Sequence, residues 1–125
     1  MCSILFTTKD IKDYDDINYY LKFRGPDDTS IVKDEVNNFT FVHNLLSMTG
    51  EFTTQPFQDD GIVCLYNGEI YNYKDFGDYK SDGYCIIDLY KEHGVNFVKK
   101  LDGEFAIALL DFNEDIILIA TDPFK

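Results

Sequence analysis

The chain begins Met1-Cys2-Ser3-Ile4-Leu5-Phe6, and its second residue is the most informative one in the sequence. Cysteine is small enough for the initiator methionine to be trimmed, which would make Cys2 the N-terminal residue. One residue would then carry a thiol and a free α-amine, groups whose unperturbed pKa values are about 8.5 and about 8. Such a pair is a nucleophile with its own base. The alternative is that Cys2 is only a small residue at the start of a buried β-strand.

The size and composition of the chain are typical of one packed domain. Its 125 residues are 45% hydrophobic and 16% aromatic, which is ample for a core and argues against disorder. The formal net charge is −12. Because a surface this acidic repels phosphate backbones and anionic lipids, we expect neither nucleic acid nor membrane as a partner.

The N-terminal segment and the cysteines predict a cytoplasmic protein. Lys9, Asp10 and Lys12 interrupt the first apolar stretch, so the sequence does not predict a signal peptide. No apolar run approaches the ~20 residues of a membrane span. Cys64 and Cys85 are expected to be buried, reduced thiols, since three widely spaced cysteines indicate neither a disulfide framework nor a metal site.

Hydrophobic periodicity predicts an α+β fold. Apolar runs predict strands at 2–8, 29–34, 38–45, 62–66, 104–111 and 115–121, and helical spacing predicts helices at 14–23, 82–93 and 95–101. Residues 50–61 are expected to form a loop, and Asn67-Gly68 is expected to end a strand in a tight turn. Strands with two apolar faces need cover on both sides, so we expect two packed sheets, each covered by helices.

A series of short motifs occurs in one order along the chain. The motifs are Met1-Cys2-Ser3-Ile4, Arg24-Gly25-Pro26-Asp27-Asp28, His43-x-x-Leu46-Ser47, Gln55-Pro56-Phe57, Tyr66-Asn67-Gly68-Glu69-Ile70-Tyr71-Asn72-Tyr73, Ser81-Asp82, Leu101-Asp102-Gly103-Glu104-Phe105-Ala106 and Asp122-Pro123-Phe124. The ordered set resembles the class II glutamine amidotransferase domain of asparagine synthetases, an N-terminal-nucleophile hydrolase, over residues 1–125. This resemblance implies a four-layer αββα sandwich of two antiparallel sheets, truncated at the C-terminus and without the synthetase domain.

The resemblance also implies an enzymatic reaction, the hydrolysis of the glutamine side-chain amide to glutamate and ammonia. Cys2 would attack the amide carbon, and its α-amine would pass the thiol proton to the departing ammonia. Asn67 and Gly68 would form the oxyanion hole, in which each donor is worth ~2.7–4 kcal/mol of transition-state stabilisation. No cofactor or metal is implied for this half-reaction.

The same resemblance implies that acidic residues bind the α-amino group of glutamine. Asp82 would bind the α-amino group with Glu69 nearby, although Asp82 fits equally well as a helix N-cap. The usual Ser-Asp-x-Glu pattern becomes Ser81-Asp82-Gly83-Tyr84, which removes one acidic neighbour. His43 is interpreted as a satisfied strand histidine, because the α-amine already serves as the base.

The main departure from the family pattern concerns the residue expected to bind the carboxylate of glutamine. The usual His-x-Arg-Leu-Ser motif has an arginine where this chain has Leu45, and that arginine would pair with the carboxylate in a bidentate manner. The carboxylate would instead be held by backbone amides near residues 46–50, which include Ser47, or by Arg24 moved inward. The alternative for Arg24 is a structural arginine that bridges to an aspartate of its own turn.

The end of the sequence bears on partners and on the alternative function. The chain ends at Phe124-Lys125 and contains no Ser-Gly-Gly-x-Asp-Ser pyrophosphate loop. The resemblance therefore implies that ammonia passes to a synthetase domain or subunit outside this sequence, where ATP and Mg would be needed. Uncovered sheet edges would favour a homo- or hetero-oligomer. The alternative is a catalytically impaired amidotransferase-like binding or regulatory module, which Leu45 favours.

Overall fold

The computed structural model describes residues 1–48 and 50–124 and contains two antiparallel sheets. The three-stranded sheet has the order β1-β3-β2, with β1 at Ser3–Thr7, β2 at Asp28–Asp34 and β3 at Phe39–Leu45. The four-stranded sheet has the order β4-β5-β6-β7, with β4 at Phe57–Asp59, β5 at Ile62–Ile70, β6 at Gly103–Asp111 and β7 at Ile116–Thr121.

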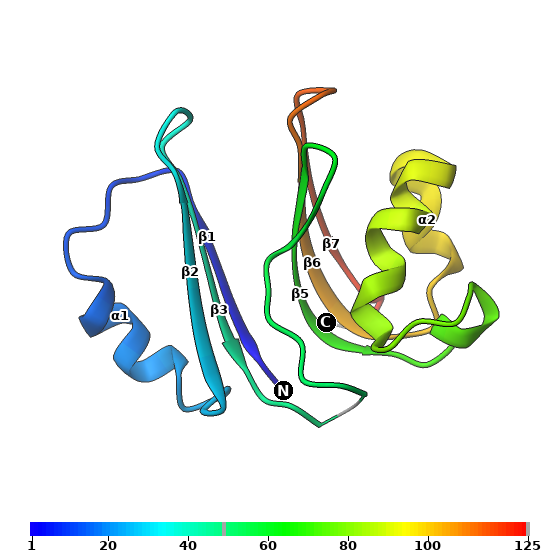
Figure 1. Ribbon diagram of the computed structural model, residues 1–125, viewed down its shortest axis with the longest axis horizontal. Helices are drawn as coiled ribbons and strands as arrows, with labels where there is room; N and C mark the ends of the chain where they lie inside the picture. The colour runs from blue at the N-terminus through cyan, green and yellow to red at the C-terminus, as the bar shows by residue number, and fades with distance from the viewer. Residues whose placement is uncertain (49, 125) are drawn as a thin grey trace.

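In the described part of the chain, two α-helices lie on the outer sides of the sheets (Figure 1). α1 (Tyr14–Leu21) flanks the three-stranded sheet, and α2 (Cys85–His93) flanks the four-stranded sheet. Three 3-10 helices accompany them: η1 (Tyr73–Asp75), η2 (Asp82–Tyr84) and η3 (Gly94–Lys100). None of these helices has the length and hydrophobicity that crossing a membrane requires. The arrangement confirms the predicted α+β class with two antiparallel sheets.

The hydrophobic residues form a core on each face of the four-stranded sheet. The core between the two sheets contains the buried side chains of Phe41, Leu65 and Leu110. The larger core lies between the four-stranded sheet and the helices, and it includes Phe97 and Leu109. Because β6 contributes to both cores, it is buried on both faces, as its apolar sequence predicts.

Polar contacts hold α1 to its sheet. Asn44 on β3 donates from Nδ2 to Asn18 Oδ1 at 2.7 Å and to Ser3 Oγ at 2.9 Å. Ser3 Oγ in turn donates to the carbonyl oxygen of Leu21 at 3.0 Å. No residue of α1 is buried, and Tyr20 projects largely into solvent. The predicted helix is confirmed, but it flanks the sheet without burying an apolar stripe.

Strand β5 runs straight through Asn67-Gly68, so the predicted turn at this pair is wrong. Asn67 is opposite Ala106 and Gly68 is opposite Phe105 in the ladder with β6. Gly68 has φ 151°, and a Cβ at this position would lie 1.9 Å from the carbonyl oxygen of Glu104. The glycine is therefore needed for close approach of two strands rather than for a turn.

The segment predicted as a loop at 50–61 contains a short strand, β4. Phe57 pairs with Cys64, Gln58 with Val63 and Asp59 with Ile62, which adds an edge strand to the four-stranded sheet. Three residues of pairing produce too little periodicity to be recognised from sequence alone.

Strand β7 is covered on one face only, contrary to the prediction that it is covered on both. Ile117 and Ile119 are 53% and 68% exposed. They are opposite Leu110 and Ala108, and thus lie on the face directed toward the three-stranded sheet. Leu118, on the other face, packs against the larger core.

Candidate active site

A cavity of about 190 Å³ lies where β1 begins, β3 ends and the second half of β5 passes. Five of the seven predicted site residues line it: Cys2, Ser47, Gly68, Glu69 and Asp82. Cys2 directly precedes β1, Ser47 follows β3, Gly68 and Glu69 lie on β5, and Asp82 begins η2, so the five residues are distributed over more than 80 positions of the sequence. Asn67 and Arg24 are not among the lining residues.

The thiol of Cys2 is half-buried at the cavity and contacts the backbone after β3. The backbone N–H of Leu46 donates to Sγ at 3.3 Å, and Sγ lies 3.7 Å from the carbonyl oxygen of the same residue. The terminal nitrogen of Met1 lies 4.0 Å from Sδ of Met48, and both methionines line the cavity. Removal of Met1 would leave the new α-amine beside this thiol, because both groups belong to one residue.

The turn before β2 positions the segment that contacts Cys2. Oδ2 of Asp27 accepts a hydrogen bond from the backbone N–H of Ser47 at 2.8 Å, and the N–H of Asp27 donates to the carbonyl oxygen of Leu45 at 2.9 Å. Gly25 is buried, and a Cβ there would lie 2.0 Å from the carbonyl oxygen of Asn44. Sequence reasoning quoted this turn as a motif but did not identify Asp27 as the residue that holds the 45–47 segment.

Asn67 lies on the face of β5 that is directed toward the other sheet. It alternates with Tyr66 and Gly68 and shares its face with Leu65, a member of the core between the sheets. Its Oδ1 is buried and has no hydrogen-bond partner among the described residues. Gly68, the next residue, lines the cavity.

The carboxylate of Asp82 is buried and accepts four hydrogen bonds. Tyr66 Oη donates to Oδ2 at 2.5 Å and the N–H of Ile70 donates to Oδ2 at 2.9 Å. Oδ1 accepts from Ser81 Oγ at 3.2 Å and from the N–H of Gly83 at 3.0 Å. Asp82 therefore joins η2 to β5 on both sides of Asn67-Gly68. The N-cap alternative for Asp82 is wrong, because Ser81 precedes the helix and neither residue forms a side-chain cap.

Tyr66 and Gln55 are two cavity residues that sequence reasoning missed. Burial, together with the neighbouring Asp82, raises the pKa of the Tyr66 hydroxyl above its usual range, which keeps it a hydrogen-bond donor. Oε1 of Gln55 accepts from the backbone N–H of Tyr66 at 2.7 Å. Both residues are in motifs quoted from the sequence, but their roles depend on contacts across the fold.

Three of the groups expected to hold a substrate carboxylate, Arg24 and the N–H groups of Leu46 and Ser47, are engaged elsewhere or lie outside the cavity. Arg24 is exposed, and the ion pairs among the described residues do not include it, so its predicted bridge to an aspartate of its own turn is wrong. The N–H groups of Leu46 and Ser47 donate to Cys2 and Asp27. Residue 49, in the segment proposed to bind the carboxylate, lies outside the described residues. Leu45, in place of the usual arginine, is 7% exposed and lines the cavity.

His43 is a buried strand residue, but it is not satisfied as predicted. Neither ring nitrogen has a hydrogen-bond partner among the described residues. Burial lowers the pKa of His43 to about 4, although the negative charge of Asp28 acts in the opposite direction. The imidazole is therefore neutral at physiological pH.

The predicted interpretation of the other two cysteines is confirmed. Cys64 and Cys85 are free and buried in the larger core. Burial raises the pKa of Cys85 to about 12, with a further contribution from Asp82, so this thiol stays protonated. Within residues 1–48 and 50–124, no group of three His, Cys, Asp or Glu residues could hold a metal ion.

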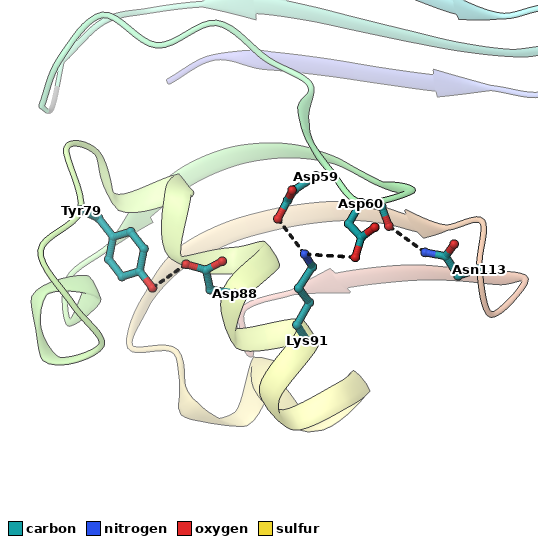
Figure 2. A network of polar contacts seen from close by, with 6 residues as sticks. All are labelled: Asp59, Asp60, Tyr79, Asp88, Lys91 and Asn113. Carbon is teal, nitrogen blue, oxygen red and sulfur yellow. Dashed lines mark hydrogen bonds and ion pairs between the residues drawn. The ribbon is translucent and has the colours of Figure 1, made fainter.

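A second cavity, of about 370 Å³, lies beside α2, and the described residues that line it include no cysteine, serine or threonine. Tyr79 and Asp88, two of its lining residues, are joined by a 2.9 Å hydrogen bond (Figure 2). Close by, Lys91 on α2 lies 2.7 Å from Asp59 and 3.8 Å from Asp60. Asn113 also donates to the carbonyl oxygen of Asp60 at 2.7 Å. The Lys91 ion pairs join α2 to the turn between β4 and β5, and the Asn113 hydrogen bond joins that turn to the turn between β6 and β7. These surface contacts therefore have a structural role.

The chain is similar to known proteins along most of its length. The sequence model of a family described as "Glutamine amidotransferase domain" matches residues 1–125. The chain is 35% identical over 115 residues to the glutamine-hydrolyzing asparagine synthetase 2 of Bacillus subtilis, covering 83% of this chain and 15% of that protein. It is 38% identical over 114 residues to the corresponding enzyme of Brassica oleracea, covering 82% and 19%. It is 35% identical over 142 residues to asparagine synthetase 1 of Saccharomyces cerevisiae, covering 98% and 24%. The chain thus spans about a quarter or less of the length of these relatives.

Proposed function

Because the chain belongs to the glutamine amidotransferase domain family, we propose that it hydrolyses the side-chain amide of glutamine to glutamate and ammonia. The observation that carries this proposal is that Cys2, directly before β1 of one sheet, and Gly68, on β5 of the other, line the same cavity. A nucleophile and an oxyanion donor must face one reacting carbon, and the shared cavity supports assigning these two roles to Cys2 and Gly68.

The proposed mechanism uses the two groups of an N-terminal Cys2. After removal of Met1, the α-amine takes the thiol proton, and the N–H of Leu46 stabilises the thiolate through its 3.3 Å hydrogen bond to Sγ. Sulfur attacks the amide carbon, and the oxyanion accepts hydrogen bonds from the side-chain amide of Asn67 and the backbone N–H of Gly68. The α-amine returns the proton to the departing ammonia, and water then hydrolyses the thioester.

The α-amino group of the substrate is proposed to lie against the acidic side of the cavity. Asp82 and Glu69 both line it, and Ser47 borders the same space. Asp82 already accepts four hydrogen bonds, so its contribution to the substrate is mainly its negative charge. This half-reaction needs no cofactor.

The ammonia is proposed to pass to an ATP-dependent synthetase domain or subunit of the asparagine synthetase type, where Mg would also be required. The names of the relatives support this coupling, since the three relatives described above are each called a glutamine-hydrolyzing asparagine synthetase. The position of α1 and α2 outside the two sheets supports the layered architecture of N-terminal-nucleophile hydrolases for this domain (Figure 1).

A diazoketone analogue of glutamine tests the proposal directly. Intact-mass and peptide analysis should locate one covalent adduct on Cys2 in protein that has lost Met1, and the same sample should release glutamate from glutamine. Cys2→Ala should abolish both signals. A chain that carries an N-terminal extension should be inactive although folded, because its base is tied up in a peptide bond.

A catalytically impaired binding or regulatory module is the second candidate function. Leu45 favours it, since a buried leucine on the cavity wall cannot pair with the carboxylate of glutamine. Such a module would bind glutamine in calorimetry without an adduct on Cys2 and without release of glutamate.

A further inference from the structure

Two side chains in the described part of the chain have buried polar atoms without a hydrogen-bond partner. They are His43, at both ring nitrogens, and Asn67, at Oδ1. Buried polar atoms of folded proteins are almost always hydrogen-bonded to protein groups or to ordered water. Because an unpaired group of this kind costs free energy, each of these two side chains needs a partner.

The side chain of His43 points from β3 into the space between the two sheets. The next residue, Asn44, contacts α1 on the outer side of the sheet, so His43 lies on the inner face together with Phe41. Ile4 is opposite His43 in the ladder between β1 and β3, and it packs against the same core between the sheets. The imidazole is fully buried there, since His43 is 0% exposed.

Asn67 points into the same space from the opposite sheet. It shares the inner face of β5 with Leu65. β5 packs against β1, which is the neighbour of β3 in the other sheet (Figure 1). The residue as a whole is half-buried but its Oδ1 is fully buried, so this oxygen is the inward end of the amide.

Both unpartnered groups lie directly behind the cavity that contains Cys2. Leu45, two residues after His43 on the same face of β3, lines this cavity. Gly68, the residue after Asn67, lines it from β5. The two side chains that lack partners are thus next to the wall that carries the proposed oxyanion donors.

The imidazole of His43 can provide the donor that Asn67 lacks. Burial lowers the pKa of His43 to about 4, so the ring is neutral at physiological pH and has one N–H donor and one acceptor nitrogen. The amide oxygen of Asn67 can only accept. The two groups form no direct hydrogen bond. A water molecule can accept from the ring and donate to the amide, and buried waters typically have about two to four such partners.

We propose, on the basis of the function proposed above, that His43 is a positioning residue for the oxyanion hole. One ordered water accepts the imidazole N–H and donates to Oδ1 of Asn67, which keeps Nδ2 of the same amide directed toward the cavity. The two ends of an amide have nearly the same shape, so hydrogen bonds decide which end faces which way. Without the bridge the amide turns over and presents its oxygen, which repels the developing negative charge that a donor would stabilise.

Steady-state kinetics on protein that has lost Met1 tests this role. Asn67→Ala should lower kcat for glutamine by about 100- to 1000-fold, the effect of losing one oxyanion donor. His43→Leu should lower kcat about tenfold and leave KM within about twofold, because the oriented amide acts only on the transition state. In protein that already carries Asn67→Ala, His43→Leu should have no further effect on kcat, because the amide that it orients is absent.

Two further variants separate positioning from packing. His43→Gln keeps a donor and an acceptor on a side chain of similar reach, and it should recover kcat to within about threefold of the wild type. Phe41→Leu is the matched control, because it removes buried volume from the same face of β3. It should lower the free energy of unfolding in urea and leave kcat unchanged.

A crystal structure of the wild type provides a readout that does not depend on turnover. A water should lie about 2.7–3.2 Å from both Oδ1 of Asn67 and one ring nitrogen of His43. The same water should be absent from the structure of His43→Leu, in which the leucine side chain cannot bind it.

The outcomes separate this inference from the function on which it rests. If the wild type turns over glutamine, three results each overturn the inference and leave the amidotransferase function intact. They are an unchanged kcat in His43→Leu, an equal loss of kcat with and without Asn67→Ala, and a crystal structure with no water between the two side chains. No turnover by the wild type, together with no adduct on Cys2 from the diazoketone, overturns both.

Discussion

The Tyr66 hydroxyl donates a 2.5 Å hydrogen bond to Oδ2 of Asp82, and both side chains are buried. The same oxygen accepts the backbone N–H of Ile70, so one carboxylate holds β5 just before and just after the proposed oxyanion donors. The pair thereby links the start of η2 to the strand that faces Cys2. The shape of the cavity therefore depends on a contact between residues that are far from Cys2 in sequence.

We expect Tyr66→Phe to lower the free energy of unfolding by about 1–3 kcal/mol, because it leaves a buried carboxylate oxygen with one partner fewer. It should also lower the rate of Cys2 labelling, since β5 loses an anchor beside Gly68. Tyr90→Phe is the matched control: Tyr90 donates a buried 3.0 Å hydrogen bond to Asp111 away from the cavity. Urea denaturation should show a similar loss for both variants, and equal labelling rates in both would contradict a role of Tyr66 in positioning the site.

Gly68→Ala should be more damaging than an alanine at another glycine with positive φ. The new Cβ at Gly68 would lie 1.9 Å from the backbone of β6, whereas at Gly94, with φ 59°, no atom lies within 4 Å. Backbone strain alone costs about 1–3 kcal/mol, and the clash at Gly68 should add about 2 kcal/mol. Thermal and chemical unfolding of the two variants check which one loses more stability. Equal losses in the free energy of unfolding would show that β5 and β6 move apart at Gly68 without a large cost.

His43 should make stability fall in mild acid. Its pKa is about 4 in the folded protein and about 6.5 in an unfolded chain, so only the unfolded state gains a proton between these values. Stability is therefore complete above pH ~6.5 and is lost as pH falls toward 4. Between pH 7 and pH 5 the wild type should lose about 2 kcal/mol more than His43→Leu. Denaturation curves at the two pH values measure this difference, and parallel losses would exclude His43 as the cause.

Ile117 and Ile119, the exposed isoleucines on β7, should contribute more to self-association than to the free energy of unfolding. Ile117→Thr with Ile119→Thr keeps β-branched residues and should change the free energy of unfolding by no more than about 1 kcal/mol. It should also reduce self-association in sedimentation experiments, because it removes an exposed apolar patch at a sheet edge. Ile107→Thr, at a buried position of β6, is the control and should cost about 2 kcal/mol or more. Unchanged association in the double variant would show that this face is not adhesive.

The sequence by itself determined the secondary structure in outline and the family. The spacing of Ile86, Leu89 and Tyr90 predicts α2, and the apolar runs around Leu109 and Leu118 predict the last hairpin. These features are local, because burial of a periodic face demands apolar residues at a fixed interval. The ordered motifs likewise identify the family, and five of the seven residues named from them line one cavity.

Only the tertiary structure decided what the motif residues contact. The pair Asn67-Gly68 is typical of a turn, but pairing with β6 continues β5 through these two residues. Asp82 reads as a cap, yet Tyr66 and Ile70 bring their donors to it. Arg24 reads as a bridge or a ligand, yet it projects into solvent. In each case the deciding partner is distant in the chain, so the energy of the contact depends on strand pairing and layer packing that local sequence does not encode.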